Sequence, residues 1–342
     1  MAALAPAEID FDPARLRAWL NEVMPETRGT LEIERIGGGQ SNPTYFVTAG
    51  SRRMVLRKQP PGELLKGAHD MGREYRIISS LYGTAVPVPE PIHYHDQPDV
   101  VGKPFYLMGR LDGRVFHDCA LPDVPPAERR DYYRAQARTL AALHAVDWQA
   151  TDLASFSRPG SFVTRQVDRW ARSWAGEDSE VAEVAGWLRA HLPLDESSGI
   201  MHGDGKFNNL VFAPDRPRII GLLDWELCTI GDPFVDLGHL WSYQWQSSLA
   251  DYGGVFGEDL AALQIPDFGE FLDDYYAAAQ SPRRMTRFYF VLGHFRAAGI
   301  FRGIGDRAAS GSASAPNAEE KGRLDRVYLR RALDNIDAHL PL

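Results

Sequence analysis

Residues 200–240 constrain the fold of this chain more than any other stretch. An apolar segment leads into Asp204, and Asn209 follows five residues later. Two short strands joined by a turn predict a β-hairpin over residues 210–223, and this hairpin delivers Asp224. The stretch therefore places one carboxylate just before a hairpin and another just after it.

This arrangement of oxygen-bearing side chains suits phosphoryl transfer. That reaction needs a carboxylate to orient the attacking hydroxyl, and an amide oxygen with a second carboxylate to hold Mg²⁺ against the phosphates of ATP. Mg²⁺ prefers hard oxygen ligands and few protein contacts. The stretch therefore carries the residue types that this chemistry requires.

The motif His202-Gly203-Asp204 with Asn209, followed by Asp224-Trp225-Glu226, resembles the catalytic core of the protein-kinase-like superfamily. In particular, it is similar to the aminoglycoside phosphotransferase family. Downstream, Gly231-Asp232-Pro233 and Asp236 match a segment that is a structural signature of that family, so both aspartates are expected to be structural.

The resemblance covers nearly the whole chain and implies its fold and cofactors. We expect a two-lobed α+β protein-kinase-like fold. Residues 1–110 would form a small N-lobe, an antiparallel sheet plus a helix, that binds the nucleotide. Residues 111–342 would form a larger, mainly helical C-lobe with the catalytic loop, metal and acceptor site. The implied cofactors are ATP and Mg²⁺.

The resemblance also implies a role for each residue of the central motif. Asp204 would act as the base, or orienter, for the acceptor hydroxyl, and the alternative is a surface carboxylate in a turn. Asn209 and Asp224 would ligate Mg²⁺. Lys206 would neutralise charge on the transferring phosphoryl group or would simply be solvated. His202 would brace the loop by hydrogen bonding.

A glycine-rich turn lies between strands predicted at 31–36 and 44–48. Such a turn lets backbone N–H groups approach phosphate closely. The alternative is a plain hairpin turn, but a kinase-like N-lobe needs a phosphate-binding turn at this place. The predicted nucleotide contacts in it are Gly38, Gly39, Ser41 and Asn42.

The third predicted strand, residues 52–58, ends in two cations. Kinases carry a cation for the α- and β-phosphates on this strand. Adjacent strand residues face opposite sides, so only one of Arg57 and Lys58 can point toward the nucleotide. Comparison with the family favours Arg57, and Glu74 in a helix predicted at 70–81 would pair with it.

Further strands are predicted at 92–95 and 103–110, and the second includes the linker position of kinases. There the backbone would recognise adenine, so Met108 and Arg110 are predicted nucleotide contacts. Gly109 stands where the family usually has an acidic residue, which leaves the adenine contacts open. Helices are predicted at 127–146, 161–175, 179–191, 233–240, 287–302 and 323–340, with a mobile loop at 303–322.

Composition limits the partners and the location of the chain. A net charge of −9 does not favour nucleic-acid or anionic-membrane binding. The two cysteines lack metal-ligand spacing, and the N-terminus resembles no signal peptide. No apolar run is long enough to span a bilayer. The cytoplasm is the simplest location.

Departures from the protein-kinase pattern favour a small-molecule acceptor. Gly203 replaces the arginine that docks a phosphorylated activation loop in many protein kinases, and no Ala-Pro-Glu segment follows Asp224. Residues 56–62 and 73–78 look closest to the phosphotransferase module found fused to, or encoded beside, acyl-CoA dehydrogenases. That likeness implies a hydroxyacyl or related hydroxylated acceptor and a functional link to an acyl-CoA dehydrogenase.

Two alternatives remain at this point. One keeps the chemistry and changes the acceptor to an aminoglycoside, a macrolide or a choline-like amine. The other is a pseudokinase or nucleotide-binding module without turnover, which arginine in place of the strand lysine keeps open. Oligomeric state and the choice between ATP and GTP are not evident from the sequence.

Overall fold

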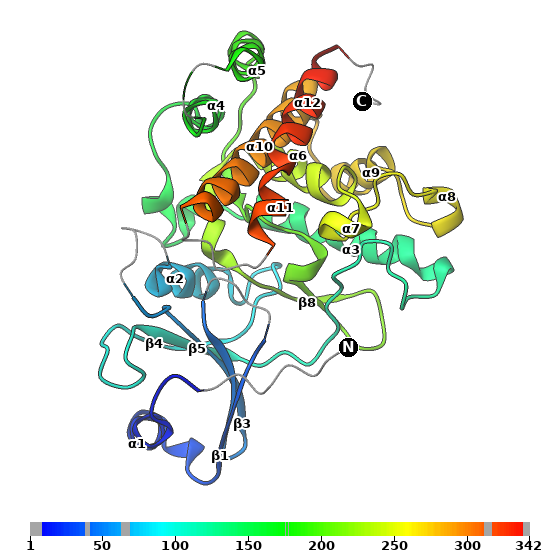
Figure 1. The fold of residues 1–342 in the computed structure, drawn as a ribbon. Helices are drawn as coiled ribbons and strands as arrows, with labels where there is room; N and C mark the ends of the chain where they lie inside the picture. Colours follow the sequence, from blue (N-terminus) through cyan, green and yellow to red (C-terminus); the bar gives the residue numbers. More distant parts are fainter. Residues whose placement is uncertain are drawn as a thin grey trace. The chain divides into compact units, whose positions relative to one another are not determined.

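The computed structural model describes residues 9–37, 42–62, 69–174, 176, 178–310 and 317–337. The chain forms two compact units (Figure 1). Unit 1 comprises residues 1–112 and 223–226, and unit 2 comprises residues 113–222 and 227–342. Asp224 therefore belongs to unit 1, in a short segment (residues 223–226) that is flanked in the sequence by residues of unit 2.

Unit 1 contains a five-stranded antiparallel sheet with strand order β1-β2-β3-β5-β4. Gly50 lies in the two-residue turn between the second and third strands with φ of +57°, which glycine adopts without steric cost. Each strand predicted for this region is present. The strands are β1 (Leu31–Arg35), β2 (Thr44–Ala49), β3 (Arg52–Lys58), β4 (Pro91–His95) and β5 (Phe105–Gly109).

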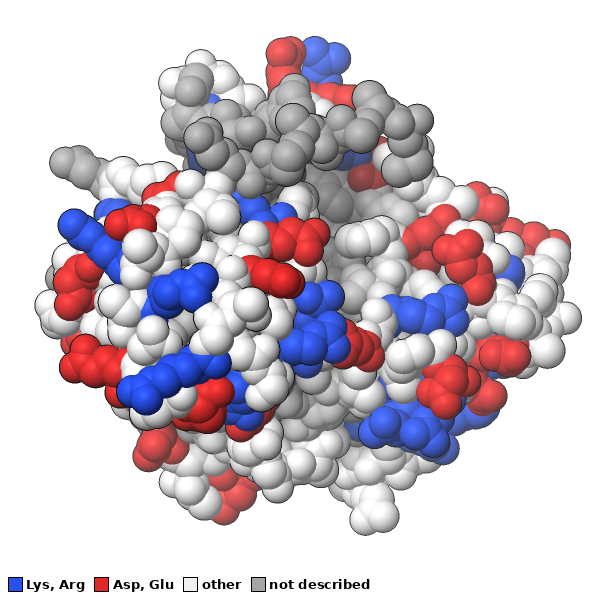
Figure 2. Space-filling view, turned by 90° about the horizontal axis from the view of Figure 1, so that it is seen from below, with Lys and Arg blue, Asp and Glu red and all other residues white. Residues whose placement is uncertain are grey.

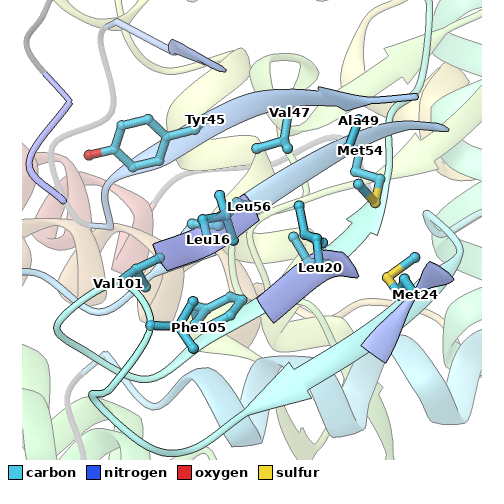
Figure 3. Close-up of a cluster of buried hydrophobic side chains, with 12 residues drawn as sticks. Leu16, Leu20, Met24, Tyr45, Val47, Ala49, Met54, Leu56, Val101 and Phe105 are labelled. Atoms are coloured by element: carbon cyan, nitrogen blue, oxygen red, sulfur yellow. The ribbon is translucent and has the colours of Figure 1, made fainter. Parts of the chain in front are cut away.

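One face of the sheet packs against α1 (Pro13–Val23), which Asp12 caps by accepting from Ala14 N at 2.8 Å. The contact buries side chains at alternate positions of the strands, because alternate residues point to the same face. Figure 3 shows this core. It consists of Leu16, Leu20, Met24, Tyr45, Val47, Ala49, Met54, Leu56, Val100, Val101, Phe105 and Leu107.

The same alternation separates the two cations at the end of β3. Lys58 lies on the face of Leu56, is 2% exposed, and its Nζ lies 2.9 Å from Asp10 Oδ1. Arg57 lies on the opposite face, where α2 (Met71–Leu81) places Glu74 against it. Lys58 is therefore part of the α1 side of the sheet.

Unit 2 is mainly helical (Figure 1). It also contains two small antiparallel strand pairs, whose first strands lie directly before and directly after residues 202–209 in the sequence. The pairs are β6 (Gly199–Met201) with β9 (Thr229–Gly231), and β7 (Leu210–Phe212) with β8 (Ile219–Leu222). The longer helices are α3 (Pro126–His144), α4 (Phe162–Arg172), α5 (Ser179–Ala190), α6 (Pro233–Gln244), α9 (Phe268–Ala279), α10 (Arg287–Ala309) and α12 (Leu324–Asp337). Short helices are α7 (Leu249–Tyr252), α8 (Leu260–Leu263) and α11 (Ala318–Gly322).

Helix α6 is buried along its whole length and packs against α10. The predicted end of this helix at residue 240 is wrong, because α6 continues to Gln244. Aromatic residues past 240 have modest helix propensity, but burial on all sides stabilises the helix regardless of propensity.

The predicted mobile loop at 303–322 is also wrong for the residues that the structure describes there. Helix α10 runs on to Ala309, and residues 318–322 form α11. A Cβ atom on Gly322 would lie 2.6 Å from the Cα of Gly305. The glycines that suggested flexibility therefore permit close packing of two helices.

None of the helices in the described part of the chain is long and apolar enough to cross a bilayer. On the face shown in Figure 2, basic and acidic side chains are interspersed, and neither sign covers a large continuous area.

Candidate active site

The path of residues 202–209 in unit 2 depends on Gly203. This residue has φ of +86°, and a Cβ atom there would lie 2.7 Å from the carbonyl oxygen of Leu227. Both the backbone conformation and the available space exclude a larger side chain without strain. Local steric constraints therefore explain why glycine occupies position 203.

Asp236 anchors the start of this loop through hydrogen bonds to its backbone. Its carboxylate accepts from the backbone N–H of His202 at 2.6 Å and of Gly203 at 2.8 Å. Burial alone would raise the pKa of Asp236, but the hydrogen bond from His144 and the charges of His144, His202 and Arg296 outweigh burial and lower it. Asp236 is thus an ionised anchor for the backbone.

Asp204 uses its two carboxylate oxygens differently. Oδ2 accepts from Asn209 Nδ2 at 3.0 Å, whereas Oδ1 lies 3.0 Å from Lys206 Nζ in an ion pair and 3.8 Å from His239 Nε2. The buried Oδ1 accepts no hydrogen bond with normal geometry. His202 Nδ1 accepts from the Asp204 backbone N–H at 3.2 Å.

Asn209 is oriented by Asp204. Its Nδ2 donates to the Asp204 carbonyl oxygen at 2.8 Å and to Asp204 Oδ2. No described residue bonds to Asn209 Oδ1. The amide is therefore fixed with its oxygen left for another ligand, and an amide oxygen is a donor that Mg²⁺ accepts.

Three buried residues near the loop were not predicted from the sequence. Arg296 on α10 donates from Nη2 to the carbonyl oxygen of Gly203 at 2.7 Å, and Tyr243 lies with its ring centroid 4.6 Å from Lys206 Nζ. Burial, followed by the charges of Arg296 and Lys206, lowers the pKa of His239 well below its usual value, so its ring is neutral. A cation inside the aromatic run 287–302 was the available signal for Arg296.

In unit 1, Arg57 brings Glu74 and Asp224 together. Its Nε lies 3.0 Å from Glu74 Oε2, and its Nη2 lies 2.7 Å from Asp224 Oδ1. The Arg57 side chain is 14% exposed and Asp224 is 34% exposed, so the second pair is open to solvent on one side. Arg57 thus contacts Glu74, its predicted partner, and also Asp224, for which no pairing with Arg57 was predicted.

Glu74 is held by a buried network. It accepts from Tyr106 Oη at 3.1 Å and from Asn42 Nδ2 at 3.1 Å, and Asn42 Oδ1 lies 2.9 Å from His69 Nδ1. Burial raises the pKa of Glu74, and the Arg57 charge opposes that rise. The Asn42 amide is therefore used inside unit 1 to orient Glu74, while Gly38, Gly39 and Ser41 lie outside the described residues.

Asp224 has φ of +65°, a left-handed conformation that is uncommon outside glycine. Such strain persists where the surrounding structure enforces it, and it is concentrated at functional sites. Asp224 Oδ1 is paired with Arg57, and Oδ2 has no partner among the described residues. This second oxygen is available to a hard cation.

The two residues predicted near adenine lie at the end of β5. Met108 is 8% exposed and pairs with Val55 of β3. The Arg110 guanidinium lies 3.8 Å from the centre of the Phe46 ring and 3.6 Å from Asp112. Arg110 is thus stacked on an aromatic ring within unit 1.

The described residues hold no group of three or more His, Cys, Asp or Glu side chains that could bind a metal ion. Structural zinc is bound by such groups, whereas Mg²⁺ is held by one or two protein oxygens plus phosphates. An amide oxygen such as Asn209 Oδ1, or a carboxylate oxygen such as Asp224 Oδ2, is a ligand of the second kind.

A family model described as the phosphotransferase enzyme family, APH, matches residues 32–288. The chain belongs to this family. Its two-lobed α+β organisation, with an antiparallel sheet and a mainly helical part, is that of the kinase-like APH fold.

Three similar proteins illustrate the range of the family. Mouse acyl-CoA dehydrogenase family member 10 is 36% identical over 90% of this chain and 29% of the mouse protein. The crystal structure of a candidate aminoglycoside phosphotransferase from Ralstonia eutropha is 34% identical, with a TM-score of 0.85 over 95% of this chain and 98% of that one. A complex of aminoglycoside phosphotransferase APH(4)-Ia with AMP-PNP and hygromycin B has 15% identity and a TM-score of 0.61 over 95% and 99% of the two chains, which indicates a shared fold.

The chain spans less than half the length of the first acyl-CoA dehydrogenase relatives that it matches. This phosphotransferase-family chain therefore corresponds to one part of those longer proteins.

Proposed function

We propose that this chain is an ATP- and Mg²⁺-dependent small-molecule kinase that phosphorylates an acceptor hydroxyl. The observation that carries the proposal is the arrangement of the Asp204 loop. Its partly exposed Asp204 carboxylate accepts from Asn209, and Asp236 anchors the loop backbone just before Asp204. A carboxylate held in this way can orient a hydroxyl and take its proton.

In the proposed reaction the acceptor oxygen forms a bond to the γ-phosphorus of ATP. The bond between that phosphorus and the β,γ-bridging oxygen breaks, and ADP leaves with the electron pair. The acceptor proton passes to the Asp204 carboxylate and then to solvent. Lys206, 3.0 Å from Asp204 Oδ1, supplies positive charge near the transferring group.

Unit 1 supplies the nucleotide contacts in this proposal. Arg57, fixed by Glu74, would bind the α- and β-phosphates, and the segment around Gly38, Gly39 and Ser41 would contribute backbone N–H groups. Met108 and Arg110 would lie near adenine. Asn209 Oδ1 and Asp224 Oδ2 would hold Mg²⁺, which neutralises phosphate charge when bound.

For the acceptor we propose a hydroxylated acyl compound. The support is similarity to proteins named as acyl-CoA dehydrogenase family members at 34–36% identity over most of this chain. Similarity to the hygromycin-bound enzyme is only 15%, and fold alone does not determine substrate. We also propose a functional link to an acyl-CoA dehydrogenase, for which the same similarity is the support.

The test is ADP release from Mg·ATP by the full chain over a matched panel of acceptors. The panel holds hydroxylated fatty acids and their thioesters, the same compounds without the hydroxyl, and hygromycin B with a macrolide as antibiotic probes. We expect ADP release that requires both Mg²⁺ and a hydroxylated acyl compound, with the phosphate ester identified by mass spectrometry.

Acceptor-dependent ADP release only with the antibiotics would overturn the acyl assignment and keep the kinase assignment. Absence of phosphoryl transfer to every acceptor, with ATP bound normally, would favour the nucleotide-binding alternative. ADP release without any acceptor does not count as support, because water can replace the hydroxyl.

A further inference from the structure

Two buried glutamines lie directly beneath the Asp204 loop. Gln136 is on α3 and Gln244 is the last residue of α6, and they are 0% and 1% exposed. Buried amides cost free energy unless every polar atom is hydrogen-bonded. Fully buried helix positions are usually occupied by apolar side chains. Two buried amides side by side therefore need an explanation.

The two side chains bind each other through both ends of their amides. Gln136 Nε2 donates to Gln244 Oε1 at 2.8 Å, and Gln244 Nε2 donates to Gln136 Oε1 at 3.1 Å. The result is a closed pair of hydrogen bonds between α3 and α6. This pairing fixes the orientation of both amides, since reversing either one would bring donor to donor and acceptor to acceptor.

The two side chains also form hydrogen bonds with the backbone of the Asp204 loop. Gln136 Nε2 also donates to the carbonyl oxygen of Gly205 at 2.9 Å, and Gln244 Oε1 also accepts from the backbone N–H of Phe207 at 3.2 Å. The pair therefore binds the two residues on either side of Lys206, and one of them, Gly205, directly follows Asp204. Asp236 and Arg296 bind the loop only before Asp204, at His202 and Gly203.

Apolar packing brings the loop close enough for these bonds. A Cβ atom on Gly205 would lie 2.9 Å from a methyl carbon of Leu140, so this glycine allows the loop to rest on α3. The Phe207 ring lies 4.8 Å from the Tyr133 ring, also on α3. The packing of Gly205 and Phe207 thus sets the distance between the loop and α3, and the hydrogen bonds of the glutamine pair set the direction of the loop backbone.

We infer that Gln136 and Gln244 are positioning residues that hold Asp204 and Lys206 in their reactive arrangement. The inference rests on the proposed function of Asp204. Both side chains are buried, so the pair acts through the Gly205 carbonyl and the Phe207 N–H. Displacement of a catalytic group by about 1 Å can lower turnover about 10²-fold, so loss of the pair is expected to act on kcat.

The first experiment replaces each glutamine by leucine, which keeps the volume and removes the hydrogen bonds. We expect Gln136→Leu and Gln244→Leu each to lower kcat about 10²-fold while KM for ATP stays near the wild-type value. The double variant should lose less than the product of the two single effects, because both substitutions break the same closed pair. Ser242→Ala, buried on α6 and bonded to His239 O rather than to the loop, is the matched control.

The second experiment compares two isosteric variants, which keep the shape of the side chain and change its hydrogen-bond donors and acceptors. Gln244→Glu keeps an oxygen to accept from Phe207 N–H and from Gln136, whereas Gln136→Glu loses at least one of the two donated bonds. We expect kcat to decrease in the order wild type, Gln244→Glu, Gln136→Glu. The reverse order, or equal values for all three, would overturn the assignment.

The third measurement is independent of any acceptor. Backbone hydrogen exchange of the peptide spanning residues 203–209 should be faster by about tenfold in the leucine variants, with exchange elsewhere in α3 and α6 unchanged. Unchanged exchange in this peptide contradicts the inference even if the proposed kinase function holds. Faster exchange together with an unaltered kcat also contradicts it. If wild type transfers no phosphate, the proposed function fails while the exchange result still decides whether the pair positions the loop.

Discussion

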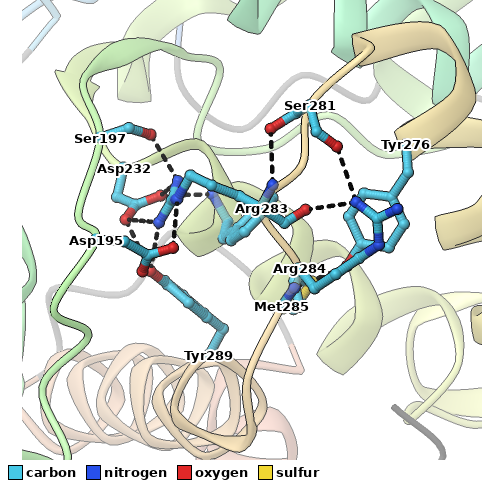
Figure 4. Close-up of polar contacts among 10 residues, drawn as sticks. Asp195, Ser197, Asp232, Tyr276, Ser281, Arg283, Arg284, Met285 and Tyr289 are labelled. Atoms are coloured by element: carbon cyan, nitrogen blue, oxygen red, sulfur yellow. Dashed lines mark hydrogen bonds and ion pairs between the residues drawn. The ribbon is translucent and has the colours of Figure 1, made fainter.

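Asp232 and Asp204 are close in the sequence of unit 2, but they differ in burial and in the number of hydrogen bonds that their carboxylates accept. At Asp232 the carboxylate is 0% exposed and accepts from Phe234 N, Tyr289 Oη and both terminal nitrogens of Arg283, at 2.8–3.1 Å. Figure 4 shows this cluster, in which Arg283 also contacts Asp195 and Ser197. At Asp204 the side chain is 21% exposed, and Oδ1 accepts no hydrogen bond with normal geometry.

This difference in hydrogen bonding distinguishes a structural carboxylate from the carboxylate that we propose to be catalytic, and sequence position alone does not. The oxygens of Asp232 are occupied by protein donors, so the side chain joins the start of α6 to α10 and to the segment before α10. Asp204 Oδ2 accepts one side-chain hydrogen bond, from Asn209, and Oδ1 is paired with Lys206 without a hydrogen bond of normal geometry, so a substrate hydroxyl can compete for them. Saturated hydrogen bonding therefore marks an aspartate that builds the fold.

The largest effect that tests this contrast is on stability. Asp232→Ala leaves the Arg283 charge without its principal partner and removes the cap of α6, so we expect a loss of about 3–5 kcal/mol in the free energy of unfolding. Urea denaturation measures it. Asp195→Ala, which removes an exposed partner of the same arginine, should cost about 1 kcal/mol or less. Equal losses in the two variants would remove the basis of the contrast.

A smaller effect is expected on magnesium dependence. Asn209→Ala removes the free amide oxygen and also one of the bonds that orient Asp204. We expect kcat, or the apparent affinity for Mg²⁺, to fall about 10–100-fold, while stability changes little. A titration of ADP release against Mg²⁺ measures this. Asn208→Ala, an exposed neighbour, should behave as wild type, and an equal defect there would argue against a specific role for Asn209.

The smallest effect is on pH dependence. The pKa of His239 and that of His294 are lowered in the folded chain, first by burial. Below the ordinary histidine pKa of about 6.5 the unfolded state therefore binds more protons, and stability should fall as the pH falls, by up to about 1.4 kcal/mol per pH unit for each histidine. His294→Phe should reduce the slope between pH 6.5 and 5 in denaturation experiments. An unchanged slope would mean that His294 is protonated in the folded state.

Local patterns in the sequence were sufficient for the strands of unit 1 and for placing Arg57 and Lys58 on opposite faces of β3, whereas the choice of Arg57 came from the family comparison. Alternation along a strand is a local property, and the burial of Lys58 on the α1 face follows from it. The central hairpin was also predictable, since short apolar runs and a turn define it. The family motif then directed attention to His202, Asp204 and Asn209.

Features that depend on distant segments were not predictable in this way. The glutamine pair joins residues 108 positions apart, and Arg296 reaches Gly203 across 93 positions. Nothing near either residue in the sequence indicates its partner. Likewise, Gly305 and Gly322 suggested a loop, because their close packing with each other is visible only when both helices are placed.

The most direct test of the account is transfer of the labelled γ-phosphoryl group of ATP to a hydroxylated acyl acceptor by wild type and by Asp204→Ala. We expect the variant to lose about 10²–10⁴-fold in transfer, while its affinity for ATP and its unfolding free energy remain close to those of wild type. Full transfer by a folded Asp204→Ala protein would contradict the account.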